Sequence, residues 1–154
     1  MANVAQQIVA SARSYIGTPF AHQGRRKRNA HDKGGVDCLG LLVGVARECG
    51  LSKSGVCLAC YDETDYGHIP NGTRLQSALK NYLHPVSDDV LLAGDVVLMR
   101  IDHHPQHLGI IGDYKQTDML SLIHAYAPAR AVVEHRLDAH WQSRIVMAYR
   151  YGGY

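Results

Sequence analysis

The apolar pattern of the chain changes at Gly94, and this change constrains the fold more than any other feature. Before it, apolar residues recur at helical spacing; after it, short β-branched runs alternate with turn residues. Helices followed by an antiparallel meander are typical of an α+β domain. We expect strands over residues 95–101, 107–113, 120–126, 131–136 and 144–151.

Helices are expected in the first part of the chain. One apolar face starts at Val4 and ends before Gly17 and Pro19; a short helix over residues 74–83 stops at Pro85. A central helix is expected from Cys38 to about Cys49, between an N-cap at Asp37 and a C-terminal glycine at Gly50. Residues 51–71 show no clear pattern. With 154 residues and no internal repeat or linker, residues 1–154 are expected to form a single domain.

Composition sets broad limits on function. A net charge of +2 gives no reason to expect specific nucleic-acid binding. Four cysteines are too few for a disulfide scaffold in a domain of this size and indicate synthesis in a reducing compartment. The N-terminus lacks the basic and apolar regions of a signal peptide, and no segment is apolar enough to span a membrane. We therefore expect cytoplasmic synthesis and delivery of the protein by another machine.

Cys38 is the candidate nucleophile. It follows a Gly-rich loop and lies in the first turn of the expected helix, where the helix dipole lowers the pKa of a thiol. The alternative is a small buried helix residue, the commonest state of a free cysteine. His107 and His124, in strand-like settings, are candidates for a general base and for the residue that orients it. The alternatives are a surface histidine and a satisfied core histidine. A cysteine at a helix start with histidines on a sheet is the layout of a papain-like hydrolase.

Three other groups have plainer interpretations. His103, His104 and His107 are close in sequence, but Pro105 interrupts helical metal-ligand spacing, so we expect no metal and no cofactor. Cys57 and Cys60 have the C-x-x-C spacing of zinc or redox sites, but the absence of a second pair favours coincidence or a local structural role. The basic run Arg25-Arg26-Lys27-Arg28 lacks interleaved aromatic residues and indicates a solvated loop or a docking loop for an acidic partner.

The order of several short motifs resembles the NlpC-type peptidoglycan peptidases, a papain-like family of cysteine hydrolases. The resemblance runs nearly from end to end. The matching segments are Tyr15-Ile16-Gly17-Thr18-Pro19-Phe20, Asp37-Cys38-Leu39-Gly40-Leu41, Ala93-Gly94-Asp95-Val96-Val97, His107-Leu108-Gly109-Ile110 and Ile123-His124-Ala125.

The resemblance implies a papain-like fold, with N-terminal helices packed on a C-terminal antiparallel sheet. It also implies attack by the Cys38 thiolate on an amide of a peptidoglycan stem peptide, with His107 as base and His124 orienting His107. Asp37 matches a residue that some members use to hold a substrate amine. Phe20 replaces a tyrosine of many members and cannot donate a hydrogen bond, so we expect either that His22 substitutes for the hydroxyl beside the substrate or that the site is weaker.

A narrower resemblance is to members encoded with phage tails and gene-transfer agents. It rests on Gly17-Thr18-Pro19, His22-Gln23, the Cys38 motif and the ending Trp141-Gln142-Ser143-Arg144-Ile145-Val146. It implies a tail component, acting at the cell wall or in the periplasm, that opens the wall for DNA entry, with tail-tip or hub proteins as partners. The alternatives are a wall amidase injected by a secretion system and a non-catalytic tail-tip assembly protein.

Overall fold

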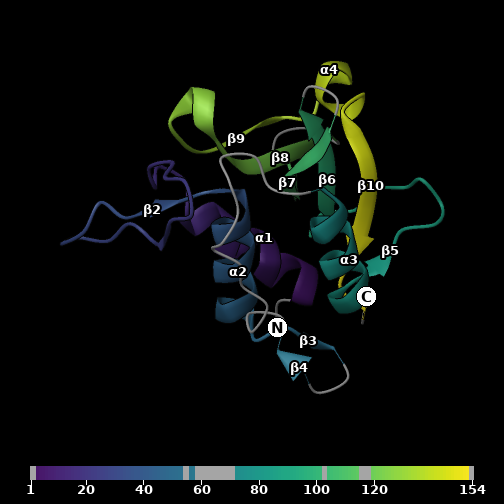
Figure 1. The fold of residues 1–154 in the computed structure, drawn as a ribbon, viewed down its shortest axis with the longest axis horizontal. Helices are drawn as coiled ribbons and strands as arrows, with labels where there is room; N and C mark the ends of the chain where they lie inside the picture. Colours follow the sequence, from purple (N-terminus) through teal and green to yellow (C-terminus); the bar gives the residue numbers. More distant parts are fainter. Residues whose placement is uncertain (1–2, 54–55, 58–71, 102–103, 115–118, 153–154) are drawn as a thin grey trace.

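The computed structural model describes residues 3–53, 56–57, 72–101, 104–114 and 119–152 (Figure 1). In chain order the elements are α1 (Val4–Ser14), β1 (Arg25–Arg26), β2 (Gly35–Val36), α2 (Cys38–Cys49), β3 (Ser52–Lys53), β4 (Val56–Cys57), α3 (Gly72–Tyr82), β5 (His84–Pro85), β6 (Val96–Ile101), β7 (His104–Asp113), β8 (Leu120–Tyr126), the 3₁₀ turn η2 (Ala127–Ala129), β9 (Ala131–Arg136), α4 (Ala139–Gln142) and β10 (Ile145–Arg150).

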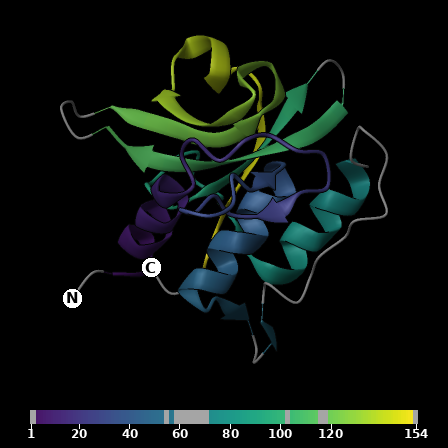
Figure 2. The ribbon, with the colours of Figure 1, turned by 90° about the vertical axis from the view of Figure 1, so that its left-hand side faces the viewer.

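An antiparallel sheet in the order β5-β10-β6-β7-β8-β9 forms the centre of the fold. Helices α1, α2 and α3 lie along one face of it, and the short α4 lies over the other face (Figure 2). The predicted α+β architecture, with N-terminal helices packed on a C-terminal antiparallel sheet, is confirmed.

The sheet is buried on both faces, which explains why its strands are apolar without strict alternation. On the helix side, Leu98, Leu108 and Ile110 belong to the larger core; Val97 and Met99 belong to a smaller core beneath Trp141. Val97 and Leu98 are consecutive and both fully buried, because one points to each layer.

The start and end of α2 follow the sequence prediction. The Asp37 side chain accepts a hydrogen bond from the Gly40 amide, and Gly50 has the left-handed φ of 62° at the helix end. The structure adds a cap that the periodicity did not predict: Asn3 and Gln6 form a capping box at the start of α1.

The start of β7 differs from the prediction. The strand begins at His104, so His107 lies inside it instead of at its first position. Pro105 is accommodated beside a register shift between Met99 and Arg100 of β6, where a missing amide hydrogen costs least. The two-residue strands β1 to β5 and the short helix α4 were also not predicted, because such short elements depend on tertiary pairing. No helix in the described ranges is long and apolar enough to cross a membrane.

Candidate active site

Asp37 fixes the start of α2 and therefore the position of Cys38. Its Oδ1 accepts hydrogen bonds from the Gly40 amide at 2.8 Å and from the Arg25 guanidinium at 2.9 Å, and its Oδ2 accepts one from the Gln23 amide at 2.8 Å. The Asp37 residue is 4% exposed. These bonds join the basic loop to the first turn of α2, so the carboxylate has a structural role; its predicted role in holding a substrate amine stays a prediction.

Cys38 is packed against the middle of β7. Its neighbours in a narrow space at the start of α2 include Leu108 and Gly109, and the Leu108 backbone amide hydrogen-bonds its sulfur. The register between β7 and β8 ends at the pair Ile110 and Ile123. His107 precedes this pair on β7 and His124 follows it on β8, so both histidines lie where the pairing of the two strands has ended.

The Cys38 thiol is neutral at rest. Burial, with a smaller contribution from the Asp37 carboxylate, raises its pKa to about 12, and the Leu108 and Leu39 amides and Arg25 offset only part of this. The sequence predicted a lowered pKa from the helix dipole. Burial outweighs the dipole because the sulfur lies among apolar side chains, with the residue 7% exposed.

His107 and His124 are paired inside the sheet. The Nε2 of His107 and the Nδ1 of His124 are 2.7 Å apart, and both side chains are buried. Burial lowers the pKa of His107 to about 4, with help from the charge of Arg144. Burial and the neighbouring histidines also lower the pKa of His124. Both imidazoles are therefore neutral at neutral pH, and a neutral imidazole can act as a base.

A third histidine, which sequence reasoning missed, extends this pair. The Nε2 of His135 lies 2.8 Å from the Nε2 of His124. On β9, His135 pairs with Leu122, whereas His124 pairs with Val133, so the two histidines are diagonal neighbours on one face. The sequence places His135 in the strand expected over residues 131–136. Only the register of that strand against β8 shows that His135 meets His124.

Aromatic rings enclose His124. The Tyr126 ring is stacked on it, with centroids 5.0 Å apart and planes at 20°, and the Trp141 ring meets it edge-on, also at 5.0 Å. The guanidinium of Arg144 lies 5.4 Å from the centre of the Trp141 ring. This packing limits rotation of the His124 ring.

Phe20 and His22 lie on a segment that runs beside the start of α2. Phe20 bridges to Val36 and packs against the larger core, and the Ala21 amide donates to the Val36 carbonyl. His22 is half-buried. It follows these contacts in the sequence and precedes Gln23, whose amide donates to Asp37. The structure places both residues near the start of α2; their contact with substrate stays a prediction.

The basic run 25–28 is held by the protein itself. Arg25 pairs with Asp37 at 2.9 Å, and Lys27 pairs with Glu48 of α2 at 2.9 Å. Arg26 pairs with Asp32 at 3.0 Å within the loop, and Arg28 contacts the Gly17 carbonyl. The run therefore fastens the loop to the helices, and Arg26 is its most exposed ion-paired side chain, at 73%.

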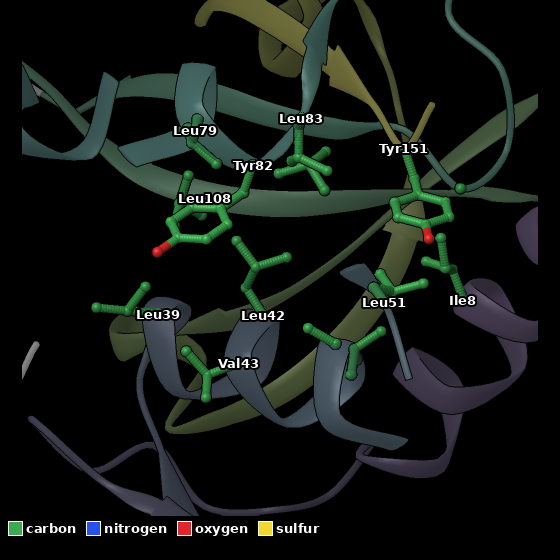
Figure 3. Close-up of a pocket in the computed structure, with 14 residues that line it drawn as sticks. Ile8, Leu39, Leu42, Val43, Leu51, Leu79, Tyr82, Leu83, Leu108 and Tyr151 are labelled. Atoms are coloured by element: carbon green, nitrogen blue, oxygen red, sulfur yellow. The ribbon is translucent and has the colours of Figure 1, made fainter. Parts of the chain in front are cut away.

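An apolar pocket of about 50 Å³ lies between α2 and α3 (Figure 3). In Figure 3, Leu42 of α2 and Tyr82 of α3 face each other across it, and Leu108 lies behind them. Leu42 and Leu108 also line the narrow space around Cys38. The pocket therefore adjoins the candidate nucleophile.

Within the described ranges, no group of three or more histidine, cysteine, aspartate or glutamate side chains could hold a metal ion. His103 and Cys60 lie outside these ranges, and the side chains of His104 and Cys57 are not described. Cys38 and Cys49 are free thiols.

The fold is shared with solved NlpC/p60 domains. The NlpC/p60 domain of the peptidoglycan hydrolase SagA superposes with a TM-score of 0.58 at 22% identity, covering 96% of this chain and 98% of that one. An NlpC/P60 family protein from Bacillus cereus ATCC 10987 gives 0.62 at 18% identity, covering 96% of this chain and 40% of that one. An N-acetylmuramoyl-L-alanine amidase from Bacteroides uniformis ATCC 8492 gives 0.58 at 14% identity, covering 99% and 100%. No protein-family model and no curated protein matches the sequence. The predicted papain-like, NlpC-type fold is thus confirmed.

Proposed function

We propose that this chain is an NlpC-type cysteine hydrolase that cleaves amide bonds in peptidoglycan stem peptides. The proposal is carried by the 2.7 Å bond between His107 and His124, together with the hydrogen bond to Cys38 from the amide of Leu108, the residue that follows His107 on β7. A thiol, a neutral imidazole and a group that orients the imidazole are the parts of a cysteine nucleophile site. The names of the structural neighbours, which include a peptidoglycan hydrolase and a muramoyl-alanine amidase, support the substrate class.

In the proposed reaction, the Cys38 sulfur attacks the amide carbonyl carbon while His107 takes the thiol proton. The carbonyl oxygen becomes an oxyanion, stabilised by the Cys38 backbone amide at the positive end of α2. When the carbon–nitrogen bond breaks, His107 gives its proton to the leaving amine, and a thioester remains on Cys38. Water then attacks the thioester, with His107 taking a proton from the water, and the Cys38 thiol and a stem-peptide carboxylate are released.

Since both groups are neutral at rest, proton transfer accompanies attack and does not precede it. Burial raises the pKa of the Cys38 thiol and lowers that of the His107 imidazole, and both shifts disfavour a thiolate–imidazolium pair. His124 keeps the His107 ring in place through the step, and Tyr126 and Trp141 keep the His124 ring in place.

Digestion of purified peptidoglycan by the wild type and by Cys38→Ala tests this function. We expect new amino ends from the wild type alone, with mass spectrometry naming the cleaved bond. Cys49→Ala is the matched control: it replaces the other described thiol and should retain cleavage. Equal cleavage by Cys38→Ala and the wild type would refute the proposal.

We further propose that a phage tail or a similar particle carries the enzyme to the wall. The resemblance of its opening, nucleophile and Trp141 segments to tail-encoded members supports this. Detection of the protein in purified particles by mass spectrometry is expected; its absence from them, with export by a secretion system, would favour the effector alternative.

The alternative of a non-catalytic docking protein has less support. The basic run expected to dock an acidic partner pairs with Asp37, Glu48 and Asp32 of the same chain. Cys38→Ala should leave particle assembly intact and abolish wall cleavage, whereas a purely structural protein would show no effect of the substitution.

A further inference from the structure

Three histidine rings from the neighbouring strands β7, β8 and β9 form a continuous hydrogen-bonded chain. His107 and His124 are joined at 2.7 Å, and His124 and His135 at 2.8 Å. The chain ends where the Nδ1 of His135 lies 2.9 Å from the backbone carbonyl oxygen of Arg136. This last link differs from the others, because a carbonyl oxygen can only accept a hydrogen bond.

The carbonyl sets the direction of every other bond when the rings are neutral. His135 carries its hydrogen on Nδ1, where it donates to Arg136, so its Nε2 accepts from the Nε2 hydrogen of His124. The Nδ1 of His124 then accepts from the Nε2 hydrogen of His107. The Nδ1 of His107 is left with a lone pair, which is the form that a base requires.

We propose that His135 is a positioning residue that transmits the fixed polarity of the Arg136 carbonyl through His124 and selects the base-competent tautomer of His107. The proposal rests on the function proposed above, since it concerns the same reacting thiol. His135 lies two hydrogen bonds from the base and touches no reacting atom, so it acts only through His124.

The surrounding packing suits this role. The rings of His135 and Trp141 are 5.1 Å apart, so both ends of the link from His124 to His135 are covered by one indole. The neighbouring Glu134 points elsewhere, to Ser121 at 2.6 Å and to Arg13. Within the part of the chain that the structure describes, no carboxylate therefore competes for the Nε2 hydrogen of His124.

Two substitutions separate hydrogen bonding from packing. His135→Phe keeps a ring against Trp141 but removes the acceptor, whereas His135→Gln supplies an amide oxygen that can accept from His124. His140→Phe is the matched control, because the exposed His140 ring also contacts Trp141, at 5.8 Å, but lies outside the chain.

The first readout is the tautomer of each ring, measured by imidazole nitrogen NMR at about pH 8 without substrate. In the wild type we expect the hydrogen on Nδ1 of His135 and on Nε2 of His124 and of His107. A wild-type spectrum with the His124 hydrogen on Nδ1 would overturn the proposal without any variant. His135→Phe should give a mixture of tautomers at His107, and His135→Gln and His140→Phe should keep the wild-type form.

The second readout is peptidoglycan hydrolysis. His135→Phe should lower kcat roughly 10–100-fold, by analogy with the outer hydrogen-bond partners of metal-binding histidines, with a much smaller change in KM. His135→Gln should recover most of this loss. An unchanged kcat together with a single His107 tautomer in His135→Phe would overturn the proposal while leaving the hydrolase function intact. Failure of the wild type to cleave peptidoglycan would overturn the proposed function. The measured tautomers would still show in which direction the hydrogen bonds between the three histidines run.

Discussion

At the scale of single residues, the environment of the site decides its chemistry more than the residue types do. Cys38 has the helix-start position that usually activates a thiol, yet burial raises its pKa to about 12. Burial also keeps His107 uncharged. Burial therefore favours a neutral pair at rest for the two candidate groups.

This neutral pair predicts the alkylation behaviour of Cys38. Because the thiolate fraction rises with pH below the thiol pKa, the rate of iodoacetamide labelling at Cys38 should rise continuously from pH 6 to pH 10, without a plateau. Peptide mapping of the labelled protein measures it, with Cys38→Ala as the background. A labelling rate that is independent of pH between 5 and 9 would indicate a preformed thiolate and contradict this account.

At the scale of elements, close backbone contact explains the glycine two positions after Cys38. A Cβ on Gly40 would lie 2.1 Å from the Gly24 carbonyl oxygen, so the loop before β1 can pack on α2 only if residue 40 is glycine. The same loop supplies Arg25 and Gln23 to Asp37. The nucleophile motif therefore contains the cap and the contact that hold its own loop.

We expect Gly40→Ala to push the loop away from α2 and to destabilise the protein by about 1–3 kcal/mol. Wall cleavage should also fall, because moving the loop strains its hydrogen bonds to Asp37. Chemical denaturation and peptidoglycan digestion measure the two effects. Gly50→Ala is the control: it forces alanine to a φ of 62° with open space around it, which costs about 1–2 kcal/mol and should spare activity. Full activity and stability in Gly40→Ala would show that the loop does not depend on this contact.

The sequence predicted the main helices and strands well, since their apolar periodicity is also what the sheet and helices bury. It also predicted Asp37 as the cap of α2. It did not predict His135, because a contact between strands depends on register, or the raised pKa of Cys38, because burial depends on the whole core. Nor does the motif at Gly94-Asp95 predict a partner for the carboxylate; in the structure Asp95 is buried and accepts two hydrogen bonds from Arg150 of β10.

At the scale of the whole molecule, the sheet is a buried layer that holds uncharged histidines at its centre. The two cores cover opposite faces of the sheet, so His107 and His124 are buried. Protonating either imidazole therefore lowers the stability of the folded protein. The pKa of each of these side chains is lower in the folded protein than in the unfolded chain. At pH values between the folded-state pKa and the unfolded-state pKa of each histidine, the unfolded chain binds more protons than the folded protein. The free energy of unfolding therefore falls as pH falls.

We therefore expect the free energy of unfolding to decrease from about pH 6.5 towards pH 5, by up to ~1.4 kcal/mol per pH unit for each buried histidine. Urea denaturation at a series of pH values measures the slope. Replacing His107 and His124 together by Gln should flatten it, because an amide does not titrate. His140→Gln, at an exposed position, should leave the slope unchanged, and an equally steep slope in the double variant would contradict the assignment.

The central claim is that Cys38 carries a stem-peptide fragment during the reaction. The most direct test mixes the protein with soluble peptidoglycan fragments, quenches in acid within seconds, and maps the protein by mass spectrometry. We predict a Cys38 peptide heavier by the acyl part of a stem peptide, seen in the wild type and absent from Cys38→Ala. The account would be contradicted if new amino ends were released without any adduct on Cys38 and if Cys38→Ala released them as fast as the wild type.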